Sequence, residues 1–274
     1  MVLQNLFERT YIINLPERAD RRQEIQAELK TIGSDLAPGK VEFFEAIKPT
    51  DYGAFPRREV LGCLLSHLHI LKIAKAENLE NVLIIEDDLA ISKRIQRVAQ
   101  YLPDFLQSTD WDILFLGFLP RYGLQFKDYY QEPVEQEINQ YTARSFSAKI
   151  TNKPLRGTHF YAVNRKIYTP LIHYLEELLN QRFKEASAVS IQSFDNLDGA
   201  YLDTAYFLFN QAHKNTRIFI VCPPLGWQRS SRSDINPSRL DRLEGLSFLL
   251  TIYRGIKSFV KKNMESVHPF FFSR

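Results

Sequence analysis

The chain has 274 residues and a net charge of +3, with 24% charged and 45% hydrophobic residues. This is ordinary globular usage, and the 20 Phe and 13 Tyr exclude disorder as the main state. Two cysteines cannot form a disulfide framework, so we expect a reducing compartment. The small net charge does not indicate nucleic-acid binding. Since neither a signal peptide nor an apolar run of about 20 residues is found, we expect a soluble, cytoplasmic protein.

The first part of the chain alternates short apolar runs with segments of helical periodicity. Strands are predicted at residues 10–15, 41–46, 82–85 and 112–116. Between them, Ile25, Leu29 and Ile32 indicate a helix that Gly33 stops, and further helices are predicted at residues 59–76 and 92–106. Fully apolar strands that alternate with helices are typical of a parallel sheet covered on both faces.

The second part begins with residues 117–153, which we interpret as a long irregular excursion. Regular structure is expected to resume with strands at 158–163 and 217–221 and helices at 166–181 and 197–211. We predict an α/β fold with a Rossmann-type, mostly parallel sheet flanked by helices. It forms one domain over residues 1–240, and a basic amphipathic helix and tail follow over residues 241–274.

The sharpest chemical feature is an acidic run, Glu86, Asp87 and Asp88, directly after the buried strand 82–85. Ligands of open α/β sheets bind beyond the carboxyl ends of the strands. Adjacent carboxylates repel one another unless a cation neutralises them, and their oxygens suit Mn²⁺ or Mg²⁺. Strand alternation places Glu86 and Asp88 on one side, as paired metal ligands, and Asp87 on the other. The alternative is a solvated acidic turn that caps the next helix.

Eight motifs follow one another along the chain: residues 12–22 (IINLPERADRR), 59–67 (EVLGCLLSH), 82–88 (VLIIEDD), 111–117 (WDILFLG), 157–163 (GTHFYAV), 196–202 (NLDGAYL), 221–225 (VCPPL) and 228–235 (QRSSRSDI). In their order and spacing these motifs resemble glycosyltransferase family 25, which includes lipopolysaccharide and collagen galactosyltransferases. The resemblance covers roughly residues 10–236.

This resemblance implies a GT-A fold, a UDP-sugar donor (typically UDP-galactose), a divalent cation and inversion at the anomeric carbon. The reaction would transfer a hexose to a glycan or lipid-linked acceptor, and a carboxylate would act as general base. Asp198 is the candidate base, with Asp195 as competitor, because Asn196 and Leu197 stand where many relatives have Pro-Val. The alternative function is a non-catalytic relative that binds a nucleotide sugar or a partner.

Seven residues are expected to contact the donor: Asn14, Arg18, Arg22, Ser66, His67, Glu86 and Asp87. Arg18 suits a diphosphate because its guanidinium is a planar fork, whereas Arg21 is expected to be solvated. Adjacent helical residues do not face each other, so Ser66 and His67 do not form a hydrolase triad. His159 and His213 are candidates for a third metal ligand.

The basic excess lies at the carboxyl end of the chain, where residues 229–274 carry nine Lys or Arg against four Asp or Glu. Residues 243–262 place Leu246, Leu249, Leu250 and Tyr253 on one helical face, with basic residues on another. Such a helix can lie on an anionic membrane surface, which would allow peripheral contact with the inner face. The alternative is that its apolar face packs on the domain.

Overall fold

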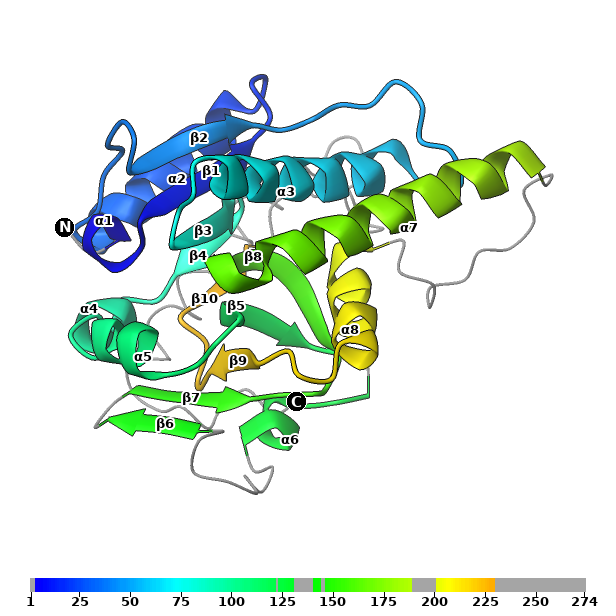
Figure 1. Cartoon of the computed structure of the whole chain (residues 1–274). Coiled ribbons are helices and arrows are strands. Elements are labelled where there is room, and N and C mark those ends of the chain that lie inside the picture. Colours follow the sequence, from blue (N-terminus) through cyan, green and yellow to red (C-terminus); the bar gives the residue numbers. More distant parts are fainter. Residues whose placement is uncertain (1–2, 122, 131–139, 144–145, 189–200, 230–274) are drawn as a thin grey trace.

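The computed structural model describes residues 3–121, 123–130, 140–143, 146–188 and 201–229. Its centre is a ten-stranded sheet in which β2-β1-β3-β8-β5-β9-β7-β6 follow in order, while β10 pairs with β4 and β5 (Figure 1). The strands are β1 (Arg9–Asn14), β2 (Val41–Glu45), β3 (Asn81–Glu86), β4 (Leu89–Ile91), β5 (Ile113–Pro120), β6 (Gln140–Ala143), β7 (Phe146–Ile150), β8 (Leu155–Asn164), β9 (Ile218–Val221) and β10 (Gly226–Gln228).

Most strands of the sheet share one direction. β1 is parallel to β2 and β3, and β5 is parallel to β9 and β10. β8 lies between β3 and β5 and is antiparallel to both, so β3 and β5 themselves point the same way. The predicted α/β class with a mostly parallel sheet is therefore confirmed. The direction of β8 was not predicted, because an apolar run looks alike in either orientation.

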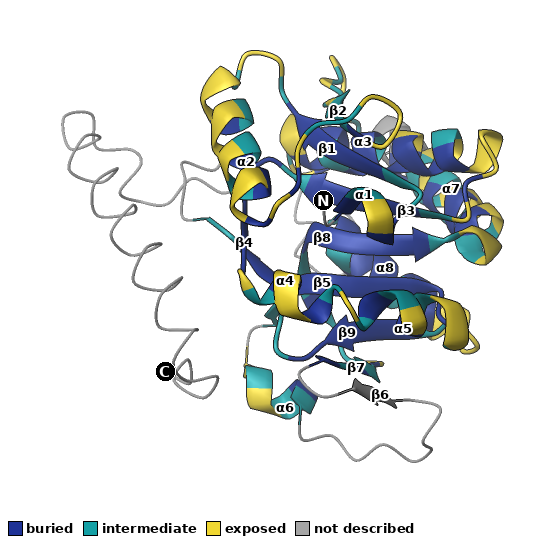
Figure 2. Ribbon diagram, turned by 90° about the vertical axis from the view of Figure 1, so that its left-hand side faces the viewer, coloured by how far each residue is buried: buried dark blue, intermediate teal, exposed yellow. Residues whose placement is uncertain are grey.

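Helices cover both faces of the sheet, as expected from its fully apolar strands (Figure 2). Side chains alternate along β1, so Tyr11 and Ile13 belong to one core and Ile12 to the other. The first core is closed by α3 (Arg58–Ala76), α7 (Tyr168–Ala188) and α8 (Leu202–Ala212). The second is closed by α1 (Leu3–Leu6), α2 (Ala19–Thr31), α4 (Arg94–Val98) and α5 (Leu102–Ser108).

Two predicted segments differ from the structure. The single helix expected at 92–106 is two short helices, α4 and α5, and Pro103 lies in the first turn of α5. Proline lacks an N–H and suits a helix start better than an interior. The excursion expected at 117–153 contains the end of β5, α6 (Phe126–Tyr130), β6 and β7. β7 reaches the sheet by pairing with β9, a long-range contact that local periodicity cannot reveal.

Several predictions concern residues outside those that the structure describes. They include the start of the helix expected at 197–211, both candidate bases, Asp195 and Asp198, and the amphipathic tail. The domain boundary at residue 240 therefore stays a prediction. Among the described helices, none is both long and apolar enough to cross a membrane.

Candidate functional site

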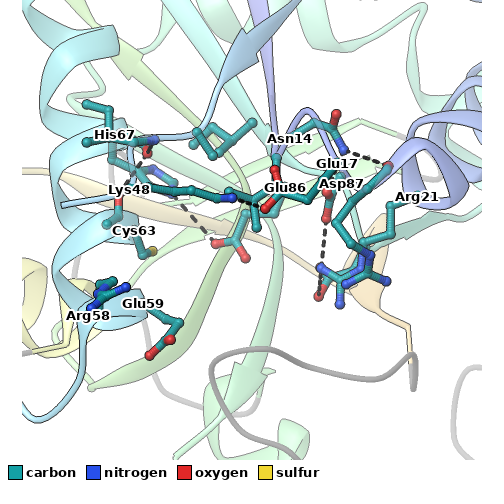
Figure 3. A pocket seen from close by; sticks show the side chains of 18 of the residues that line it. Asn14, Glu17, Arg21, Lys48, Arg58, Glu59, Cys63, His67, Glu86 and Asp87 are labelled. Atoms are coloured by element: carbon teal, nitrogen blue, oxygen red, sulfur yellow. Dashed lines mark hydrogen bonds and ion pairs between the residues drawn. The ribbon is translucent and has the colours of Figure 1, made fainter. Parts of the chain in front are cut away.

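A cavity of about 760 Å³ opens at the carboxyl ends of β1 and β3, where the sequence predicted a ligand (Figure 3). Its volume lies in the usual range for small-molecule sites. The start of α2, the loop 46–50 after β2, the first half of α3 and the acidic run form its walls. The predicted donor-binding residues that line it are Asn14, Arg18, Ser66, His67, Glu86 and Asp87.

Asp87 belongs to a closed, buried network. Its carboxylate accepts hydrogen bonds from Arg21 Nη1 at 2.9 Å and from Asn14 Nδ2 at 2.8 Å. Arg21 and Asp87 are 8% and 6% exposed. Burial raises the pKa of Asp87, whereas the Arg21 guanidinium opposes that rise. Arg21 therefore stabilises the acidic turn and is not the solvated residue that we expected; helical periodicity alone does not show which of several arginines faces the sheet.

Asp88 is buried but only half partnered. Its Oδ2 accepts from Gln228 Nε2 at 2.9 Å, whereas its Oδ1 has no hydrogen-bond partner. Burial, followed by the negative charge of Glu86, raises the pKa of Asp88 to about 7. A buried carboxylate oxygen without a donor is costly, and a cation would relieve that cost. The structure also differs from the alternation that we assumed, because β3 ends at Glu86 and the next two acids form a turn.

Glu86 lies on the opposite side of the acidic run, toward α3. Its Oε1 accepts from Thr158 Oγ1 at 2.9 Å and lies 3.7 Å from His67 Nε2. The Cys63 thiol, one turn before His67 on α3, completes a group whose ligand atoms all lie within 4.8 Å of one another. Burial alone would raise the pKa of Glu86, but the nearby His67 and His159 rings and Thr158 hold it below its usual value.

Ser66 supports the cavity wall. Its hydroxyl donates to Gly62 O at 2.7 Å and accepts from Ile47 N–H at 2.9 Å, which ties the loop 46–50 to α3. A Cβ at Gly62 would stand 2.6 Å from Ile47 O, so this close approach requires glycine. Ser66 therefore shapes the predicted donor pocket, and its hydroxyl already donates one hydrogen bond and accepts another.

The two arginines predicted to bind the donor are placed differently. Arg18 lines the cavity and forms two hydrogen bonds with the Asp20 carboxylate, at 2.9 and 3.0 Å. Arg22 is absent from the cavity walls; its guanidinium donates to Asn14 Oδ1 at 3.0 Å and lies 4.4 Å from the Phe43 ring centroid. Arg22 thus positions Asn14, and a donor contact of its own would need movement of the side chain.

Strand β10, which was not predicted as a strand, completes the site. Besides the contact of Gln228 with Asp88, Arg229 donates its backbone N–H to Asp88 O and its Nη2 to Asp87 O, both at 2.8 Å. Some 140 residues separate these partners along the chain, so only the pairing of β10 with β4 brings them together. Trp227 is buried at 5% exposure, as a core aromatic would be.

The candidate third ligands lie in different environments. His159 is buried on β8, packed between Gly117 and Gly157, and is close enough to influence Glu86. His213 is exposed at the end of α8, where its Nδ1 lies 3.1 Å from Phe209 O, and it does not line the cavity. Of the two, only His159 is near the acidic run.

The residues present suit a divalent cation. Asp88 offers a buried oxygen without a partner, and Glu86 adds a second carboxylate at the same cavity. Carboxylate oxygens are the ligands that Mn²⁺ and Mg²⁺ prefer. Which ion binds, and through which atoms, stays a prediction.

The fold and the cavity define an α/β protein with a mostly parallel sheet and an acidic turn at the ligand-binding edge of that sheet. Residues 58–189, which are 132 of the 274, match the family described as "Glycosyltransferase family 25 (LPS biosynthesis protein)". This match includes α3, the acidic run and β8, and it confirms the predicted resemblance to glycosyltransferase family 25.

Individual relatives match a smaller share of the chain. A "Glycosyltransferase 25 family member" of Aedes aegypti is 32% identical over an alignment of 129 residues, and the match covers 39% of this chain and 20% of that protein. "Procollagen galactosyltransferase 1-B" of Xenopus laevis is 30% identical over an alignment of 129 residues, and the match covers 40% of this chain and 21% of that protein. "Inactive glycosyltransferase 25 family member 3" of Homo sapiens is 26% identical over an alignment of 136 residues, and the match covers 40% of this chain and 22% of that protein. The matched part is thus about a fifth of these relatives.

Among solved structures, a glycosyltransferase involved in the glycosylation of the major capsid of PBCV-1 aligns with 81% of this chain and 94% of its own. The sequence identity is 10% and the TM-score 0.42.

Proposed function

We infer that this protein is a glycosyltransferase that moves a hexose, foremost galactose, from a UDP-sugar to a glycan or lipid-linked acceptor. The reaction is expected to need Mn²⁺ or Mg²⁺ and to invert the anomeric carbon. The observation that carries the proposal is the half-partnered, buried carboxylate of Asp88 at the wall of a cavity of about 760 Å³. The family match and the galactosyltransferase relatives support the choice of reaction and sugar.

Residues on different sides of the cavity would carry out different parts of the reaction. Asp88 and Glu86 would hold the cation, which supplies Lewis-acid stabilisation of the departing diphosphate when it is bound. Arg18 would donate hydrogen bonds from its planar guanidinium to the diphosphate. Asn14 and Asp87 would keep the turn rigid through the hydrogen bond between their side chains. Ser66 and His67 would shape the donor pocket from α3, and Asp198 would take the proton from the acceptor hydroxyl.

The competing function is a non-catalytic relative that binds a nucleotide sugar or another partner. A human relative is itself described as inactive, so family resemblance alone does not separate the two functions. The intact acidic run and the open cavity favour catalysis.

Turnover of UDP-galactose with and without Mn²⁺ would decide between them. We expect metal-dependent release of UDP, faster with a glycan acceptor, that is lost on chelation and in Asp88→Asn. Metal-dependent binding of UDP-sugars without release of UDP, across a panel of donors and acceptors, would contradict catalysis and favour the binding function.

A further inference from the structure

A thiol, an imidazole and a carboxylate meet on the α3 side of the cavity. Cys63 and His67 are four residues apart on α3 and therefore share one helix face, and Glu86 approaches them from the end of β3 (Figure 3). The distance from His67 Nε2 to Glu86 Oε1 is 3.7 Å, and Sγ of Cys63 lies within 4.8 Å of both groups. All three residues line the cavity, so a small ion can reach them from solvent.

His67 is held in the orientation of a metal ligand. Its ring is 0% exposed, and its Nδ1 lies 2.8 Å from Tyr161 Oη, which lies 2.9 Å from Tyr206 Oη. If Nδ1 carries the proton and Tyr161 accepts it, the lone pair of Nε2 points toward the cavity. Ligating histidines usually donate their second ring nitrogen in this way, which fixes both tautomer and ring. Nε2 itself is buried without a hydrogen-bond partner.

The charge of this corner also favours a cation. The Glu86 carboxylate lies beside the Cys63 thiol and the His67 ring. A divalent ion bound among them would deprotonate the thiol outright. One thiolate and one carboxylate would together neutralise two positive charges.

We propose that Cys63, His67 and Glu86 form a zinc site at the α3 end of the cavity, with a fourth position open toward the cavity. A tetrahedral zinc ion with ligand bonds of about 2.0–2.3 Å needs ligand atoms roughly 3.3–3.8 Å apart. The His67–Glu86 pair already has that separation, and Cys63 must approach by a change of rotamer. Glu86 is also the second carboxylate expected beside Asp88, so the two sites share this residue. The thiolate selects Zn²⁺ over Mn²⁺ and Mg²⁺, which distinguishes this site from the all-oxygen ligation expected at Asp88.

The test is a titration of the full chain, stripped with a chelator, with Co²⁺ as a coloured substitute for Zn²⁺. We expect a saturable sulfur-to-cobalt charge-transfer band together with the visible bands of a four-coordinate ion, and their loss when Zn²⁺ is added. Cys63→Ser should remove the charge-transfer band and lower Zn²⁺ affinity at least about tenfold. The matched control is Cys222→Ser, which removes the other cysteine, at the end of β9, and should keep the band.

A second variant tests the positioning of His67. Tyr161→Phe keeps the aromatic packing but removes the acceptor of Nδ1–H, so Zn²⁺ affinity should fall about 10–100-fold while the charge-transfer band persists at saturation. Absence of the charge-transfer band in the wild-type chain, or its loss in Cys222→Ser, would overturn the proposal. So would its persistence in Cys63→Ser. None of these readouts uses a sugar donor, so failure of UDP-sugar transfer would leave the spectrum, and this inference, intact.

Discussion

The two sides of the cavity differ in whether their buried carboxylate and imidazole groups have hydrogen-bond partners. On the α2 side, both carboxylate oxygens of Asp87 accept a hydrogen bond, one from Asn14 and one from Arg21. On the α3 side and at Asp88, a carboxylate oxygen and an imidazole nitrogen are buried without partners. Natural proteins satisfy nearly all buried polar groups, so a buried oxygen or nitrogen that lines a cavity without a partner is a candidate for contact with a ligand. We therefore predict that Asp87 holds the turn in place and that Asp88 and His67 contact the ligand.

The largest expected effect is on stability and concerns the hydrogen-bonded Asp87 on the α2 side of the cavity. Arg21→Ala leaves the Asp87 carboxylate buried with Asn14 as its remaining side-chain donor, so unfolding free energy should fall by about 3–5 kcal/mol. Urea denaturation measures it. Arg22→Ala is the control: it removes a ring contact and a half-buried hydrogen bond from the same helix without leaving a buried charge unpaired, and should cost only about 1 kcal/mol. Equal losses in both variants would contradict the distinction.

The next effect is on activity and concerns Asp88, whose carboxylate is only half partnered. Asp88→Asn keeps the size of the side chain but removes its charge, so metal-dependent UDP-sugar turnover should fall about 10²–10³-fold, equivalent to several kcal/mol. Stability should change by less than about 1 kcal/mol, because the lost charge was buried and poorly compensated. Steady-state kinetics and thermal unfolding on the same sample measure both. Asp87→Asn should show the reverse profile, with stability lost first.

A smaller effect concerns the wall between the two sides. Ser66→Ala removes the acceptor of Ile47 N–H, and unfolding free energy should fall by about 1–2 kcal/mol as the loop 46–50 loosens. KM for the donor should rise more than kcat falls. Ser108→Ala is the matched control: its hydroxyl bonds the carbonyl four residues back, as Ser66 does, but at an exposed helix end. A measurable loss in the control would show that the helix bond, and not the loop, carries the effect.

The smallest effect concerns Arg18. Its guanidinium holds the pKa of Asp20 at about 2, below the usual 3.8, so the stability that this pair contributes is present above pH 4 and is lost as pH falls toward 2. If Arg18 binds the diphosphate as proposed, Asp20 would compete for its guanidinium and add negative charge, so Asp20→Asn should tighten UDP-sugar binding a few-fold (roughly half a kcal/mol or more). Isothermal titration at low and high salt measures it. Weaker binding would show that Asp20 orients Arg18 for the donor.

The sequence by itself determined the main elements and the place of the ligand. Apolar runs and helical spacing predicted β1, β2, β3, β5, β8 and β9 and the helices α2 and α3 to within a few residues. They also predicted α7, although the helix continues to Ala188, past the predicted end at residue 181. Acids directly after a buried strand predicted the edge of the sheet where the cavity lies, because the end of a strand is a local property of the chain.

Tertiary structure alone decided which acid has which partners. Asp87 meets Arg21 and Asn14 because α2 packs over the carboxyl ends of β1 and β3, and Asp88 meets Gln228 because β10 returns to pair with β4. These contacts join residues 66 to 140 positions apart, and no local pattern encodes them. Glu86 also meets Cys63 and His67 through tertiary structure. Their spacing of four residues places Cys63 and His67 on one face of α3, but only the packing of α3 on the sheet brings the Glu86 carboxylate to them.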